Sequence, residues 1–270
     1  MRRTLPGIAG CVFLFFTLPS AGAESRSDND PNVVSPPSFI RDGKLDVQAV
    51  VDYFEDLYRA NSSTATARLI VTRPRRTKTM QLQMWTQGRE KALIVIQEPA
   101  REKGIATLKV GDNLWNYFPR IRRTIRIPPS MMQSAWMGTD FTNDDLVRES
   151  RYTTDYFHEL IGPIADPNGW LIRFTAKPET VGLWERFDLV VSRDGTIPRQ
   201  AKYYDRKGRH ARTLYWSDVK VFDGRRLPAH LTLIPEGEKG QKTEMIYLAL
   251  DFDVALPDST FSLSELERTR

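Results

Sequence analysis

The side chains that could carry acid–base chemistry are few and widely separated. Asp251 and Asp253 lie two residues apart, and two carboxylates can serve as general acid and general base. Along a strand, however, both would point to one outward face, where charges commonly line a sheet edge. His158, His210 and His230 have no acidic or nucleophilic partner at a recognised spacing. We therefore predict no catalytic residue and a protein that is not an enzyme.

Metal-ligating residues also fail to form a recognisable set. Asp140, Thr142 and Asp144 have the first three spacings of a calcium loop, but Asp145 stands where that loop needs glycine and Arg151 where it needs glutamate. The single cysteine and the dispersed histidines exclude the usual zinc sites. Phosphate-loop, dinucleotide-binding and hydrolase signatures are missing from the sequence. We expect neither a metal nor another cofactor.

The elements that must position any site are mostly strands. Apolar residues in Leu45–Ala60 recur at steps of three and four, which predicts one amphipathic helix. From Ala67 onward the period changes to two, and turn pairs such as Gly111-Asp112 separate the runs. About a dozen such runs favour one antiparallel meander. The predicted fold class is mainly β with a few helices, in which a single curved antiparallel sheet is closed by the N-terminal helix and a short-helix lid.

Residues 128–150 interrupt the strands, and we interpret them as an insertion that lies over one face of the sheet. Ser130 and Gln133 have the spacing of a capping box and Gly138 follows as a stop, which predicts a short helix. Its predicted apolar face consists of Met131, Met132, Ala135 and Trp136, with Met137 beside it. Two interpretations are open. Methionine adapts its shape, which suits a lid that yields to flexible acyl chains, but the same residues could be a permanent plug in the core.

The N-terminus predicts export. Arg2 and Arg3 precede the apolar run Ile8–Leu18, and Ala21-Gly22-Ala23 fits a cleavage site after Ala23. Cys11 lies in a lipobox-like context, but most of the apolar run follows it, which argues against lipidation. The predicted organisation is a signal peptide over residues 1–23, a flexible lead-in over 24–44 and one domain over 45–270. We expect the mature protein in the periplasm.

A basic cluster stands out from the mild overall charge. The net charge of +5 falls further if the signal peptide is cleaved, and it is too small to argue for nucleic acid. A strand is expected over Ile121–Ile127, and Arg120, Arg122 and Arg126 are expected on one face of this strand region, with Ile121, Ile125 and Ile127 on the other face. Such a row could meet phospholipid headgroups or an acidic partner, or it could be an ordinary solvated face. Both interpretations stay open.

One central stretch carries a family resemblance. Residues Leu108–Leu146 contain a W-x-Y-x-P-x-x-R-R strand pair followed by a G-T-D-F loop, and later segments add Y-Y-D, D-G-R-R-L-P and K-T-E. This pattern resembles the LolA-like outer-membrane lipoprotein-sorting protein family over about residues 45–266. The matching residues are Trp115, Tyr117, Pro119, Arg122, Arg123, Gly138, Thr139, Asp140 and Phe141.

The resemblance implies a half-barrel of about eleven strands with a hydrophobic cavity that carries lipid or lipoprotein acyl chains. It implies acylated cargo and an inner-membrane transporter of the ABC or RND type as partners, and delivery towards the outer membrane. A sensor or adaptor for an inner-membrane complex is the alternative. The candidate cavity and lid residues are Leu69, Val71, Leu82, Met84, Trp115, Tyr117, Met131, Met132, Trp136 and Met137.

Overall fold

The structure, a computed structural model, describes residues 38–148, 152–180 and 182–268. The predicted signal peptide and its cleavage after Ala23 lie outside these ranges. The helical elements are α1 (Val47–Glu55), η1 (Pro129–Met131), η2 (Trp136–Gly138), α2 (Asn143–Arg148), α3 (Tyr152–Asp155), η3 (Asp258–Phe261) and α4 (Leu263–Leu266). No helix in the described ranges is long and apolar enough to cross a membrane.

The strands form two sheets of very different size. A small hairpin pairs β1 (Ile40–Arg41) with β2 (Lys44–Leu45). The other strands are β3 (Ser62–Arg73), β4 (Arg76–Gln87), β5 (Lys91–Glu98), β6 (Ala106–Val110), β7 (Asn113–Phe118), β8 (Arg123–Arg126), β9 (Tyr156–Ala165), β10 (Asn168–Ala176), β11 (Trp184–Val191), β12 (Pro198–Asp205), β13 (His210–Phe222), β14 (Arg225–Pro235) and β15 (Lys242–Phe252).

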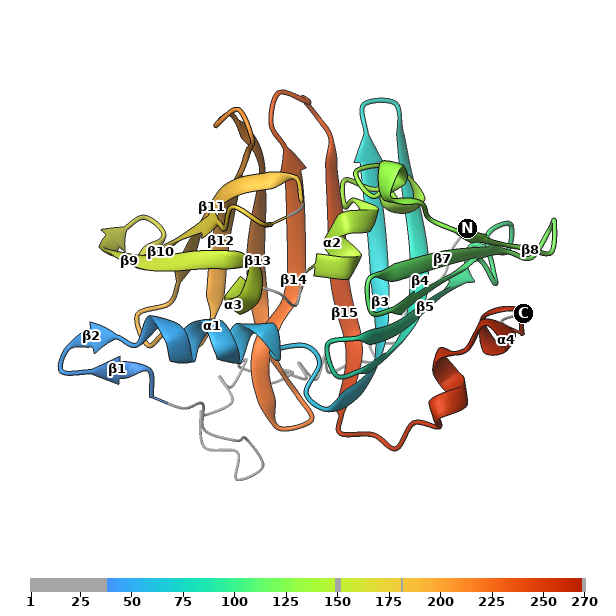
Figure 1. Cartoon of the computed structure of the whole chain (residues 1–270), viewed down its shortest axis with the longest axis horizontal. Coiled ribbons are helices and arrows are strands. Elements are labelled where there is room, and N and C mark those ends of the chain that lie inside the picture. The colour runs from blue at the N-terminus through green and yellow to red at the C-terminus, as the bar shows by residue number, and fades with distance from the viewer. Residues whose placement is uncertain (1–37, 149–151, 181, 269–270) are drawn as a thin grey trace, which may run out of the picture. The chain divides into compact units, whose positions relative to one another are not determined.

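The large sheet has 13 strands in the order β8-β7-β6-β5-β4-β3-β15-β14-β13-β12-β11-β10-β9. Strands that lie side by side are consecutive in the sequence except at the centre, where β3 pairs antiparallel with β15 and Ala67 lies opposite Tyr247. The sheet therefore consists of two meanders joined through the first and last strands. It is open and curls so that α1, α2 and α3 lie within its curve (Figure 1). The predicted fold class is confirmed, with 13 strands where about eleven were expected.

Both faces of the first meander, which consists of β3 to β8, are covered. On the inner face, alternate residues of β3 and β4 such as Leu69 and Leu82 are fully buried in the main core, which also includes residues of α1 and η2. On the outer face, side chains of β5, β6 and β7 pack against Phe261 and Leu266 from the C-terminal segment. Because strand residues alternate between faces, neighbours in sequence serve two separate cores.

The N-terminal helix is shorter than predicted. Asp46 caps it by accepting a hydrogen bond of 3.1 Å from the Ala49 N–H, and it ends at Glu55 instead of near Ala60. Past Glu55 the backbone closes tighter turns, with Asp56 N–H donating to the Tyr53 carbonyl. Ala60 takes a φ of +51°, which ends helical winding and turns the chain into β3.

The predicted lid helix over Ser130–Gly138 is wrong. The chain forms two short 3-10 turns, η1 and η2, separated by a bend. The backbone of residues 132–136 bonds instead to the following loop, because Trp136 N–H donates to Phe141 and the Ser134 carbonyl accepts from Asn143. These crossing bonds replace helical ones, so the methionines do not share one helical face. The loop that follows leads into the short helix α2.

The predicted strand over Ile121–Ile127 is also too long. Residues 119–122 form the turn between β7 and β8, and Arg122 has a φ of +49°. Arg120 and Arg122 therefore lie at a hairpin tip, whereas Arg126 lies on β8 opposite Trp115. The three arginines do not form the expected row on one strand face, because the tight turn after Pro119 removes two of them from the ladder.

Candidate functional site

A cavity of about 190 Å³ lies between the inner face of the sheet and the elements that cover it. Its walls come from α1, the η2–α2 segment and α3 on one side and from strands of both meanders on the other. Most of the lining residues are apolar, and charged residues such as Glu55, Lys109 and Asp144 also reach the cavity. The aromatic members of the lining are Phe54, Tyr58, Trp136, Phe141, Tyr152, Tyr156, Trp184, Phe187, Tyr203, Trp216 and Tyr247. A partly open cavity with such walls suits an apolar ligand.

The structure brings only part of the predicted cavity set together. Met84 and Trp136 line the cavity. Three others are buried in the main core and do not line the cavity: Leu69, Val71 and Leu82. Trp115 and Tyr117 point to the opposite face of the sheet and pack beneath the C-terminal segment.

The three predicted lid methionines have different environments. Met131 is 48% exposed, and Met132 packs against the small cluster of Leu114, Ile127 and Val147. Met137 lies partly buried at the margin of the main core. None of the three is among the cavity-lining residues.

Trp136, which lines the cavity, holds residues 136–145 (the covering segment) against the sheet. Its side chain is 1% exposed, and its indole Nε1 donates to Thr107 Oγ1 at 3.0 Å. Thr107 in turn donates to Asn116 Oδ1 at 2.7 Å, so the polar atoms of this buried chain are satisfied. Burial of the ring and this network together hold η2 against β6 and β7.

A buried ion pair joins α2 to the second meander. Arg212 on β13 makes two hydrogen bonds of 2.6 and 2.7 Å with the carboxylate of Asp145 in the first turn of α2. The guanidinium also lies over the rings of Trp184 and Tyr203, at 4.2 and 4.6 Å. Both charged groups border an apolar cavity, so each depends on the other for compensation.

The charge state of this pair follows from its surroundings. Burial alone would raise the pKa of the Asp145 carboxyl, but the charge and hydrogen bonds of Arg212 oppose burial. The Thr142 N–H adds a bond of 2.7 Å to the carboxylate. The net effect lowers the pKa of Asp145 below its ordinary value, so the carboxylate is ionised at neutral pH.

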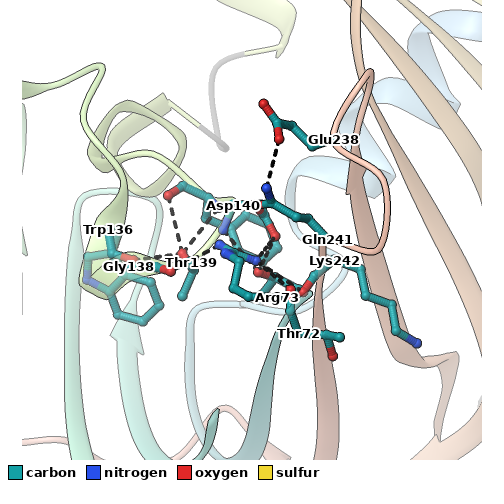
Figure 2. Close-up of polar contacts among 11 residues, drawn as sticks. Thr72, Arg73, Trp136, Gly138, Thr139, Asp140, Glu238, Gln241 and Lys242 are labelled. Atoms are coloured by element: carbon teal, nitrogen blue, oxygen red, sulfur yellow. Dashed lines mark hydrogen bonds and ion pairs between the residues drawn. The ribbon is translucent and has the colours of Figure 1, made fainter. Parts of the chain in front are cut away.

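A second arginine–aspartate pair holds the same segment to the end of β3. Arg73 Nη1 donates to Asp140 Oδ2 at 3.0 Å, and Nη2 donates to the Gly138 carbonyl at 3.1 Å. Thr243 on β15 donates to the Asp140 carboxylate at 2.7 Å and accepts from the Asp140 N–H. Figure 2 shows Arg73 reaching between Gly138 and Asp140. Residues 136–145, the covering segment, are therefore tied to β3, β15 and β13.

Comparison with known proteins places this architecture in a family. A family model described as an uncharacterized protein matches residues 88–268, about two thirds of the chain. The chain belongs to the family that this model describes, and its fold is LolA-like. This confirms the resemblance seen in the central motif. No match was found among curated proteins.

Three solved structures share the fold of this LolA-like protein. A DUF1329 family protein from Desulfovibrio piger has a TM-score of 0.74 and 23% identity, covering 82% of this chain and 98% of its own. A LolA superfamily protein from Nitrosomonas europaea has a TM-score of 0.68, 21% identity and coverages of 81% and 98%. An outer membrane lipoprotein-sorting protein domain from Vibrio parahaemolyticus has a TM-score of 0.68, 18% identity and coverages of 81% and 97%.

The two ion pairs of this LolA-like chain were missed at the sequence level. Asp140 could have been singled out because it lies in the G-T-D-F motif, but no motif in the sequence points to its partner Arg73. Asp145 was considered only as a misfit in a calcium loop. Arg212 resembles any arginine that alternates with apolar residues on a strand, and only the folded chain brings it to Asp145.

Proposed function

We propose that this protein is a periplasmic carrier that binds lipid or lipoprotein acyl chains in the cavity and delivers them towards the outer membrane. An inner-membrane transporter of the ABC or RND type is the proposed source of its cargo. The LolA-like fold supports a role in carrying or sorting. The observation that carries the proposal is the aromatic cavity beneath a covering segment that is held by two ion pairs.

The composition of the walls favours binding over catalysis. In the described part of the chain, no histidine is among the lining residues. The hydroxyls of Ser63 and Thr86, which line the cavity, lie 2.7 Å apart and hydrogen-bond to each other. Neither is paired with a base of the kind that activates a nucleophile. Cargo would therefore exchange through apolar contacts without a covalent step.

The size of the cavity implies that the covering segment moves when cargo binds. At about 190 Å³ it is smaller than the roughly 300–1,000 Å³ typical of ligand pockets. Each methylene taken from water contributes about 0.8 kcal/mol, so burial of a long acyl chain can offset the free energy of moving this segment away from the sheet. The covering segment is thus proposed as a lid.

Filling the cavity should abolish binding without unfolding the protein. Ala92 on β5 lines the cavity and is only partly buried, so an Ala92→Phe ring has room to extend into the empty space. We expect at least about tenfold weaker displacement of a fluorescent fatty acid, with a stability change of about 1–3 kcal/mol at most. Titration of the ligand and urea unfolding measure the two effects.

The matched control is Ala165→Phe, because Ala165 is exposed at the end of β9. It should bind the fatty acid like the wild type. A folded Ala92→Phe protein with undiminished uptake would show that acyl chains do not occupy this cavity. Lipid mass spectrometry of protein purified from cells would then identify the natural cargo or its absence.

A further inference from the structure

The β7–β8 hairpin carries charge that the fold does not use. Arg120 and Arg122 in its turn and Arg123 and Arg126 on β8 are all exposed, four arginines within seven residues. In the ranges that the structure describes, none of them has a carboxylate partner, and Arg126 donates to the side-chain oxygen of Asn113 instead. Like charges at this spacing repel one another unless anions approach.

Apolar side chains are interleaved with these arginines and remain in solvent. Ile121 is 59% exposed and Ile125 is 43% exposed, and Met131 in η1 just beyond β8 is 48% exposed. The same stretch buries Ile127 to 7% against Leu114, so the hairpin can bury an isoleucine where the fold requires one. Three large apolar side chains on or next to the edge strand are therefore exposed, which suits an interaction surface.

The turn itself does not need these side chains. Ile121 N–H and Arg122 N–H close it by donating to the Phe118 and Pro119 carbonyls, both at 3.3 Å. Arg122 has a φ of +49°, a conformation that glycine adopts without strain. The backbone geometry is therefore satisfied without an arginine at the tip, which leaves the side chain available for binding.

We propose that the β7–β8 edge docks the protein onto an anionic phospholipid bilayer. The arginines would contact lipid phosphates while Ile121 and Ile125 reach the boundary between headgroups and acyl chains. Charged side chains alone would be enough to bind an acidic protein. The exposed isoleucines between the arginines favour a membrane, because they can insert among the lipids. As the edge strand, β8 lies at one end of the sheet with only β7 beside it, so a flat surface can approach it (Figure 1). This docking rests on the proposed function and deepens it, because it names the surface at which a carrier meets a membrane.

Vesicle co-sedimentation tests this docking without any cargo. The purified protein should bind vesicles of phosphatidylcholine mixed with phosphatidylglycerol more strongly than vesicles of phosphatidylcholine alone. Binding should weaken as salt is raised to ~1 M, where the Debye length falls to about 3 Å. Arg120→Glu with Arg122→Glu should lower the partition coefficient at least about 25-fold, since each basic side chain near an anionic surface contributes about fivefold.

Matched controls separate local from general effects. Lys207→Glu with Lys239→Glu changes the charge equally at two exposed turns elsewhere and should leave binding within about twofold of the wild type. Ile121→Ser should weaken binding in ~1 M salt, where Val219→Ser, also apolar and 43% exposed on β13, should not. The N-terminal residues are the same in every variant, so their contribution cancels.

Two results would overturn the proposal. The first is undiminished vesicle binding by the folded arginine double variant, which would favour an acidic protein as the partner of the cluster. The second is an equal loss of vesicle binding in the lysine control, because binding would then depend only on net charge. Fatty-acid binding by the arginine variant should be unchanged, so failure here is distinct from failure of the cavity.

Discussion

Replacing Asp145 with asparagine is expected to cost about 3–5 kcal/mol of unfolding free energy, because it leaves the buried Arg212 guanidinium uncompensated. The side chain of Arg212 is 7% exposed and that of Asp145 is 16% exposed, so water cannot take over the lost interaction. Asparagine keeps the shape of aspartate, which confines the change to charge and hydrogen bonding. Urea unfolding of both proteins measures the difference.

A matched control uses an exposed pair of the same type. Glu185 and Arg206 lie 3.9 Å apart with about half of each side chain exposed, so Glu185→Gln should cost no more than about 1 kcal/mol. Replacing both buried partners, as Asp145→Leu with Arg212→Met, should recover most of the stability lost in Asp145→Asn, since no charge is left buried. A loss of less than about 1 kcal/mol in Asp145→Asn would contradict the buried pair.

The same pair predicts a pH dependence with a definite sign. The folded state lowers the pKa of Asp145 below its ordinary value of 3.8. Its stabilising contribution is therefore fully present above the unfolded pKa and is lost as the pH falls through the folded pKa. The difference in stability between wild type and Asp145→Asn should be constant near neutral pH and shrink below about pH 4. A difference that does not change with acid would assign the loss to another cause.

Trp136→Ala is expected to cost about 3–5 kcal/mol and to release the covering segment from the sheet. The ring is 1% exposed in the main core, and its indole N–H donates to Thr107. Limited proteolysis should then cut within residues 136–145 faster than it cuts the wild type there. Thermal or urea unfolding gives the energetic effect, and the site of cleavage gives the structural one.

Trp136→Phe separates packing from hydrogen bonding. It retains an aromatic ring but removes the indole donor, so we expect a smaller loss of about 1–3 kcal/mol and continued protection of the segment. If Trp136→Ala proved nearly as stable as the wild type, the ring would rest loosely on the cavity. The two interpretations of the apolar region from Met131 to Met137 thus receive different answers at different residues, since Trp136 is packed in the core whereas Met131 is exposed.

Local patterns in the sequence were enough for the fold class. The alternation along β3 and β4 and the turn pairs between strands depend only on neighbouring residues, because the pleat and the positive φ of a tight turn are local properties. The helix at Val47–Glu55 was recognised from its period. The single helix predicted over Ser130–Gly138 was wrong, because backbone groups of Met132, Ser134 and Trp136 bond to residues 141–144.

Tertiary structure alone decided which residues form the site. Both faces of β5 are apolar, with Ala92 towards the cavity and Leu93 towards the C-terminal segment, so alternation could not say which face is inside. Trp115 and Tyr117 on β7 were assigned to the cavity and lie on the other face. The pairing of β3 with β15 and the contact of Arg212 with Asp145 join segments far apart in the chain. Such contacts arise from closure of the sheet, which no local spacing records.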